Sequence, residues 1–73
     1  MQKSIYAEEY KAFLQRLCQA RKETGLTQME VAELLGKPQS YIAKCENGER
    51  RVDIVELAEF AKIYDKPIVY FLG

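Results

Sequence analysis

The sequence predicts an all-α fold, a compact bundle of five helices in one domain that spans residues 1–73. Two observations support this fold class. Apolar residues recur every three or four positions in the first third of the chain, and two capping boxes open helices further on. Glycine or a polar turn follows each of the first four expected helices. The helices are expected at about residues 5–23, 28–35, 38–45, 54–64 and 67–72.

The first helix, residues 5–23, has a single apolar stripe. Its members follow the i, i+3, i+4, i+7 spacing of a helix that buries one face: Tyr6, Tyr10, Phe13, Leu14 and Leu17. An aromatic stripe at this spacing is typical of a core rather than of a surface that stacks on bases. Gly25 is expected to end the helix.

The second and third helices form the central pair of the chain. A Thr27-x-x-Glu30 capping box opens the first of them, and Gly36 can take the left-handed conformation that ends it. Pro38 is expected in the first turn of the next helix, where a missing N–H costs nothing. Two helices joined by so short a turn suggest a helix-turn-helix.

The fourth and fifth helices complete the bundle. An Asp53-x-x-Glu56 capping box predicts a helix to about Tyr64, and Pro67 begins a last, short helix. This tail is unusually apolar for a chain terminus. Two interpretations stay open: it covers the core of its own chain, or it forms a homodimer interface. The candidate interface residues are Ile68, Tyr70, Phe71 and Leu72.

Composition argues against several functional classes. The chain has no histidine, no Gly-rich phosphate loop and no catalytic Ser or Cys motif, so we expect neither an enzyme nor a cofactor. Cys18 and Cys45 fit no disulfide framework and no metal site. No signal peptide or membrane span is visible, and a reduced cytoplasm is the expected location. The net charge is zero, although residues 1–51 hold nine Lys/Arg against seven Asp/Glu.

The central pair resembles the helix-turn-helix of phage lambda repressor and Cro, the XRE family of bacterial regulators. The matching elements are Gly25-Leu26-Thr27-Gln28, Ala32, Gly36, Gln39-Ser40-Tyr41-Ile42 and Glu46-Asn47-Gly48. The five-helix layout also fits, so the resemblance covers nearly the whole chain. It implies a lambda repressor-like bundle whose third helix lies in the major groove of double-stranded DNA.

The resemblance also implies roles for individual residues. Base contacts are expected from Gln39, Ser40 and Lys44, because amide, hydroxyl and ammonium groups can read base edges. Phosphate contacts are expected from Gln28, Lys37, Tyr41, Asn47, Arg50 and Arg51. Arg21 and Glu46 match a structural ion pair.

Each role has a plainer alternative. The outward residues of the third helix could be a solvated face. Tyr41 could pack on the surface with its hydroxyl in solvent, and the two loop arginines could simply pair with Glu49 or Asp53.

The sequence therefore predicts a sequence-specific transcriptional regulator that binds a pseudo-palindromic operator as a homodimer and acts as a repressor. One recognition helix reads too few base pairs to mark a site, so two copies are expected. No small-molecule ligand is evident. The alternative is a protein-interaction or antitoxin-like module with the same fold, for which DNA binding is secondary.

Overall fold

The computed structural model describes the backbone of residues 4–73 and the side chains of residues 8–73. These residues form five α-helices and no strand, so the predicted all-α, five-helix fold is confirmed. Tyr6, the first member of the predicted apolar stripe, lies outside the described side chains. The helices are α1 (Ser4–Thr24), α2 (Gln28–Leu35), α3 (Gln39–Asn47), α4 (Ile54–Tyr64) and α5 (Ile68–Leu72).

Local signals define where α2 and α4 begin. The Thr27 hydroxyl accepts the Glu30 N–H at 3.1 Å, and the Glu30 carboxylate accepts the Thr27 N–H at 2.9 Å. Asp53 and Glu56 make the same reciprocal pair at 2.8 and 3.0 Å. Both capping boxes thus satisfy two N–H groups that a helix leaves without intrahelical partners.

The prediction for the start of α3 was wrong by one residue. Pro38 is the residue before the helix and not its first turn, with an extended backbone at φ −73° and ψ 156°. Its carbonyl accepts the Tyr41 N–H at 3.0 Å, as the carbonyl of a capping residue does. Pro38 is therefore the cap residue of α3. Pro67 is likewise the residue before its helix, so α5 begins at Ile68 and not at residue 67, and α3 runs on to Asn47 instead of ending near residue 45.

The core lies between all five helices. Its largest fully buried side chains come from four of them: Leu17, Ile42, Phe60, Tyr64 and Phe71. Stacked aromatic rings form part of this core. The Phe60 ring stacks with that of Tyr41 at 6.4 Å and with that of Tyr64 at 5.9 Å between ring centroids. The rings connect α3 to α4 through side chains.

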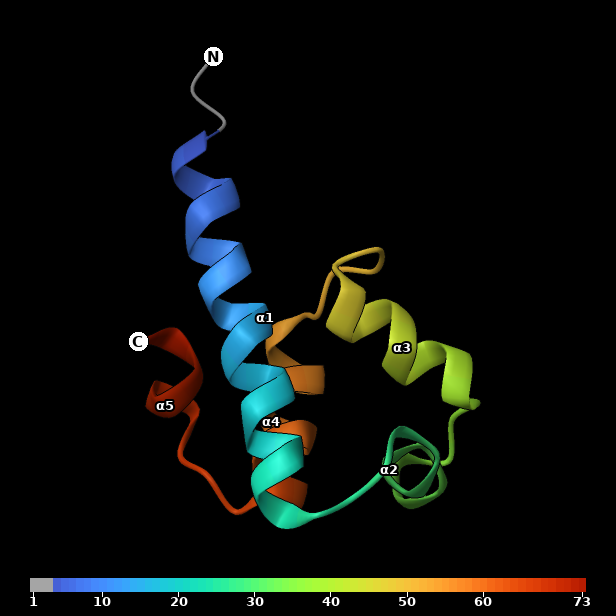
Figure 1. The fold of residues 1–73 in the computed structure, drawn as a ribbon. Helices are drawn as coiled ribbons and strands as arrows, with labels where there is room; N and C mark the ends of the chain where they lie inside the picture. The colour runs from blue at the N-terminus through green and yellow to red at the C-terminus, as the bar shows by residue number, and fades with distance from the viewer. Residues whose placement is uncertain (1–3) are drawn as a thin grey trace.

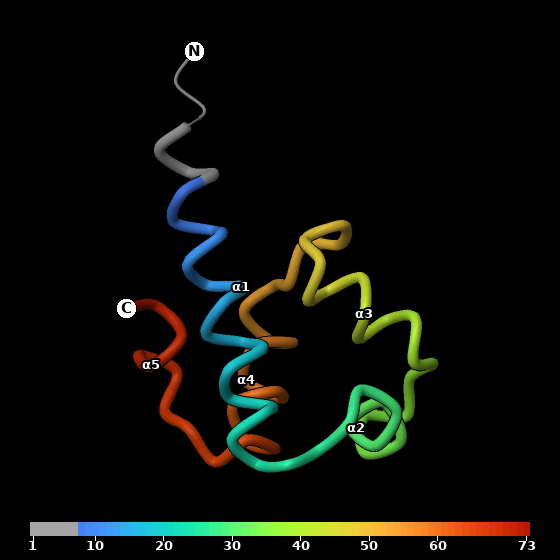
Figure 2. The backbone as a smooth tube through the Cα atoms, viewed as in Figure 1, coloured from blue at the N-terminus to red at the C-terminus, as the bar shows by residue number. Residues whose placement is uncertain are grey.

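The arrangement leaves α3 at one edge of the bundle. In Figure 1, α3 and α5 lie on opposite sides of α1, and Figure 2 shows the same path of the backbone. The turn between α2 and α3 passes through Gly36, whose φ of +68° is a left-handed conformation that glycine adopts without strain. Within residues 4–73, no helix combines the length and apolar character needed to cross a membrane.

Candidate nucleic-acid interface

One face of α3 is free of contacts with the core. Gln39, Ser40 and Lys44 are exposed, whereas Ile42 and Cys45 on the opposite face have no exposed surface. At about 100° per residue, the three exposed residues span an arc of roughly 140°. The structure thus brings the three predicted base-contacting residues together on one outward surface.

A chain of hydrogen bonds connects α1 to this surface. Arg21 Nε donates to Glu46 Oε2 at 2.6 Å, and Arg21 Nη2 donates to Glu46 Oε1 at 3.1 Å. Gln28 Nε2 donates to the same Glu46 Oε1 at 3.0 Å. Gln39 Nε2 in turn donates to Gln28 Oε1 at 3.4 Å. The Gln39 side chain is therefore linked, through one long hydrogen bond to Gln28, to the ion pair that joins α1 to α3.

The Arg21–Glu46 ion pair is well shielded from solvent. The two side chains are 14% and 6% exposed, and Arg21 Nη1 also donates to the Leu26 carbonyl at 3.0 Å. The hydrogen bond to Glu46 raises the pKa of Arg21 above its ordinary value. The structure thus forms the ion pair between α1 and α3 that the resemblance implied.

Gln28 has a different environment from the one expected of a phosphate contact. It is the half-buried first residue of α2, and its amide is shared between Glu46 and Gln39. One N–H of this amide is not used by either bond. A phosphate contact through that group stays a prediction.

The cationic and amide residues around α3 are not all on its outward face. Lys37 and Asn47 are exposed at the two ends of α3, with Lys37 Nζ 5.2 Å from the ring centroid of Tyr41. Arg51 instead lies 4.3 Å over the ring of Tyr10 on α1. Arg51 is thus directed away from the residues predicted to contact bases.

Arg50 already has partners. Its Nη1 and Nη2 atoms each donate to one carboxylate oxygen of Glu56 at 2.9 Å, and Nη1 also donates to the Arg51 carbonyl at 3.2 Å. Its guanidinium lies 4.7 Å over the ring of Tyr41. The pairing predicted as the alternative, with Glu49 or Asp53, is wrong about the partner, which is Glu56.

The predicted phosphate contact by Tyr41 is not available in this structure. The side chain is 8% exposed, and its hydroxyl is buried without a hydrogen bond. Burial raises the pKa of Tyr41 to about 12. The plainer alternative, with the hydroxyl in solvent, is also wrong, because the ring inserts toward Phe60.

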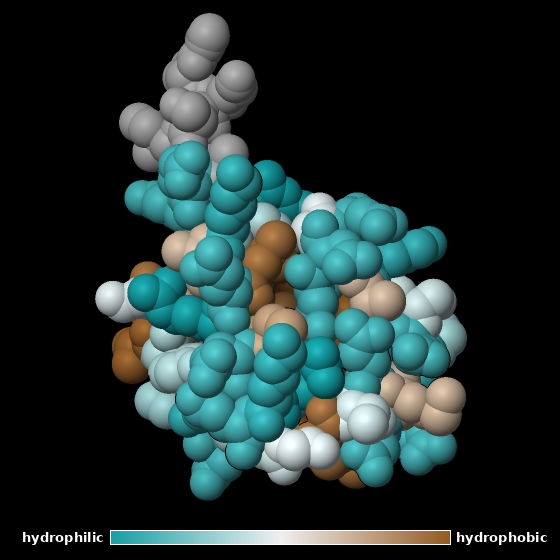
Figure 3. Space-filling model, in the orientation of Figure 1, coloured by the Kyte–Doolittle hydropathy of each residue, from teal (hydrophilic) through white to brown (hydrophobic). Residues whose placement is uncertain are grey.

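The predicted interface residues of the tail divide between core and surface. Phe71 is fully buried in the core of its own chain, so its assignment to a dimer interface is corrected. Ile68 and Tyr70 are half-buried against the same core. Leu72 is 68% exposed. Hydrophobic surface is visible where α5 ends, on a face that is otherwise mostly hydrophilic (Figure 3).

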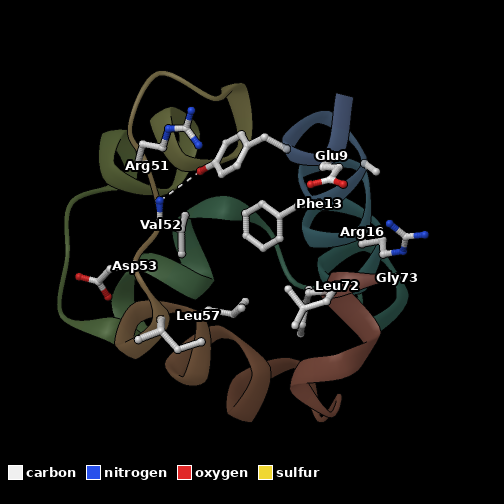
Figure 4. Close-up of a pocket in the computed structure, with 13 residues that line it drawn as sticks. Glu9, Phe13, Arg16, Arg51, Val52, Asp53, Leu57, Leu72 and Gly73 are labelled. Carbon is white, nitrogen blue, oxygen red and sulfur yellow. Dashed lines mark hydrogen bonds between the residues drawn. The ribbon is translucent and has the colours of Figure 1, made fainter. Parts of the chain in front are cut away.

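A groove of about 670 Å³ lies beside the exposed end of α5. Figure 4 shows Phe13 at its centre, Leu72 on one side, and Val52 and Leu57 on the other. Four charged residues also line it: Glu9, Arg16, Arg51 and Asp53. The Tyr10 hydroxyl accepts the Val52 N–H at 3.1 Å and so fixes the loop that forms one wall.

Sequence reasoning missed this groove and the Arg50–Glu56 ion pair. Three separate segments form the groove, and no spacing in the sequence connects them. A signal for the ion pair was present, because Glu56 belongs to a capping box that places its carboxylate near the preceding loop.

Comparisons with known proteins agree with this geometry. The helix-turn-helix family matches residues 19–71 of the chain. A solved structure of an XRE-family like protein from Pseudomonas syringae pv. tomato is 40% identical, with a TM-score of 0.89. That match covers 96% of this chain and 85% of the other. No curated protein matches. With a helix-turn-helix in place and the outward face of α3 unobstructed, the chain belongs to the XRE-type helix-turn-helix family of DNA-binding regulators.

Proposed function

We propose that this protein is a transcriptional repressor that reads a pseudo-palindromic operator as a homodimer through α3. The observation that carries the proposal is the exposed Gln39 side chain, held by Gln28 at the end of a hydrogen-bond chain from Arg21. A preorganised amide loses less conformational entropy when it pairs with a base. Repression follows where the operator overlaps a promoter and the bound dimer excludes polymerase.

The exposed side chains of α3 have the chemistry for base recognition. A Gln39 amide can pair with adenine through N6 and N7, and the Lys44 ammonium can donate to guanine O6 and N7. Ser40 can donate or accept. We expect phosphate contacts from Lys37 and Asn47, which are exposed at the two ends of α3.

The groove beside α5 supports pairing of two copies. Its apolar lining includes the exposed Leu72, and its charged residues are two acidic and two basic, so a two-fold axis can set the acidic groups of one copy against the basic groups of the other. The proposed interface is therefore this groove, in which the exposed Leu72, and not the fully buried Phe71, supplies the accessible apolar surface of α5. A two-fold pair would place its recognition helices about 34 Å apart, one turn of DNA.

Selection of bound duplexes from a random library tests the proposal. We expect a motif with two inverted half-sites whose centres lie about one helical turn apart. Gln39→Ala should then lose preference at one base step in each half-site, by about 1–3 kcal/mol. If the protein enriches no motif at moderate salt, the proposed function is wrong.

Sedimentation at several concentrations tests the dimer separately. Leu72→Glu places a charge on the proposed interface and should shift the protein to monomer. Leu34→Glu, an equally exposed position on α2, is the matched control and should leave the association unchanged. A wild-type monomer both free and on DNA would contradict the dimer. The exposed groove would then favour the other candidate function, a module that binds a partner protein.

A further inference from the structure

Arg50, which was expected to contact a DNA phosphate, is held on several sides by residues of its own chain. The Glu56 carboxylate binds it through both oxygens, the Arg51 carbonyl accepts a third bond, and the Tyr41 ring lies beneath the guanidinium. The Arg50 side chain is still 43% exposed, so the site is open to solvent and to ions. Its charge is nevertheless matched by that of Glu56.

The same contacts join α3 to α4. Within these two fully described helices, no Cα atom of α3 comes within 8 Å of a Cα atom of α4. The connection is made by side chains: Tyr41 stacks on Phe60, and Arg50 binds Glu56. The Arg50 N–H also donates to the Lys44 carbonyl in the last turn of α3, at 3.2 Å. Arg50 therefore holds the end of α3 against the beginning of α4.

We propose that Glu56 and Tyr41 withhold Arg50 from the DNA backbone, so that Arg50 positions α3 and does not contact phosphate. The inference rests on the proposed operator reading and names a determinant of its specificity. A phosphate contact adds affinity for every sequence alike. Withholding one cation lowers this non-specific affinity, and discrimination then depends more strongly on the base contacts of α3.

Glu56 is well suited to this role because it is itself fixed. Its Oε1 atom accepts the Asp53 N–H of the capping box at 3.0 Å while it also binds Arg50. The Arg50 guanidinium lowers the pKa of Glu56 to about 2, so the carboxylate stays charged even in mildly acidic solution. A DNA phosphate offers Arg50 the same bidentate geometry, and an exchange of partners would therefore gain little.

Salt dependence of DNA binding separates the two roles of Arg50. The logarithm of the association constant is measured against the logarithm of salt concentration, on the selected operator and on a scrambled duplex. The variants are Arg50→Gln and Glu56→Gln. Glutamine at position 56 keeps an amide oxygen for the capping box but loses the charge that holds Arg50. Glu59→Gln is the control, since Glu59 is exposed on the same helix and makes no ion pair within the described residues.

If Arg50 is withheld, Arg50→Gln leaves the salt slope unchanged and weakens operator binding several-fold, because α3 is less firmly placed. Glu56→Gln frees Arg50, so the slope on scrambled DNA steepens by about 0.9 per protomer and the ratio of operator to scrambled affinity falls. Glu59→Gln should leave both slope and ratio unchanged. Circular dichroism and thermal unfolding confirm that each variant is folded before binding is measured.

Two results would overturn this inference. The first is a slope that Arg50→Gln flattens by about 0.9 per protomer on both duplexes, which would make Arg50 a phosphate contact. The second is an equal change of salt slope and affinity ratio in Glu59→Gln and Glu56→Gln. Such a result would mean that only the net charge of the protein matters, and not the ion pair with Arg50. Either result leaves the proposed function intact. That function fails only if the wild-type protein shows no preference for the operator.

Discussion

Two arginine–glutamate ion pairs hold the recognition helix, and they differ in almost every respect. Arg21 and Glu46 are 25 residues apart in sequence, join α1 to α3, and are 14% and 6% exposed. Arg50 and Glu56 are six residues apart, join the α3–α4 loop to α4, and are 43% and 17% exposed. One pair is nearly withdrawn from water, and the other is in contact with it.

The difference in exposure determines what each pair can contribute. A shielded pair is costly to break, because removal of one partner leaves the other charged and poorly solvated. An exposed pair is screened by salt and adds little to stability. The first pair therefore fixes the fold around Gln39, and the second is better suited to controlling the charge available to DNA. Four measurements test this contrast.

The largest effect is expected from Arg21→Met. This change leaves the Glu46 carboxylate 6% exposed and without its cation, and the free energy of unfolding should fall by about 3 kcal/mol. Urea denaturation at neutral pH measures the change. In the double variant with Glu46→Leu, the loss should shrink, because no charge is left unpaired. A double variant that is less stable than Arg21→Met would contradict the assignment of the loss to an orphaned charge.

Gln28→Ala should have the next largest effect. The quantity that changes is the affinity for DNA and not the stability of the fold. Without the Gln28 amide, Gln39 loses its acceptor, and operator affinity should fall by about 1 kcal/mol while affinity for scrambled DNA is unchanged. Gel shifts on both duplexes measure this. Equal weakening on both would instead make Gln28 a phosphate contact, as the resemblance implies.

Glu56→Gln should have a smaller, pH-dependent effect on stability. The pKa of Glu56 is lowered to about 2, so its stabilising contribution is present above the ordinary glutamate pKa near 4.3 and is lost as pH falls toward 2. The difference in unfolding free energy between wild type and variant should therefore be greatest near pH 6 and shrink between pH 4 and pH 2. Urea unfolding across this range measures it, and a constant difference would contradict it.

The smallest effects are expected for two buried tyrosines, one near each pair. Tyr41 contacts Arg50, and burial, followed by the charge of Glu46, raises the pKa of Tyr64. Both hydroxyls are buried without a hydrogen-bond partner, so Tyr41→Phe and Tyr64→Phe should not lower the unfolding free energy. A loss above about 1 kcal/mol in thermal or urea unfolding would show that the hydroxyl has a partner in solution.

The fold could be predicted because its signals are local. Thr27 and Asp53 each form a capping box with a glutamate three residues on, and Gly36 supplies the left-handed turn, so few residues define each boundary. The start of α3 was predicted one residue too early because the fixed φ of Pro38 suits both the cap position and the first turn. Only ψ distinguishes these two positions. The five-helix arrangement followed from these boundaries and from the resemblance.

The site was less predictable because side-chain direction decides it. The ion pair of Arg21 with Glu46 came from the resemblance and not from the residues themselves. In the five-residue helix α5, neighbours Phe71 and Leu72 were equally apolar, and only packing on α1 buries the first and exposes the second. Arg50 and Arg51 are adjacent and alike, yet they turn to opposite partners, Glu56 and Tyr10.

The opposite directions of Arg50 and Arg51 have a thermodynamic consequence. Arg50 contacts Tyr41 of α3, whereas the next residue, Arg51, lines the groove proposed as the interface with the second copy. Suppose that pairing of two chains favours the loop conformation that binds DNA. Pairing then raises the affinity for DNA, and DNA binding raises the affinity of the two chains for each other by the same factor, because linkage is reciprocal. Under the proposed function, an operator that binds α3 more tightly would also make a tighter dimer.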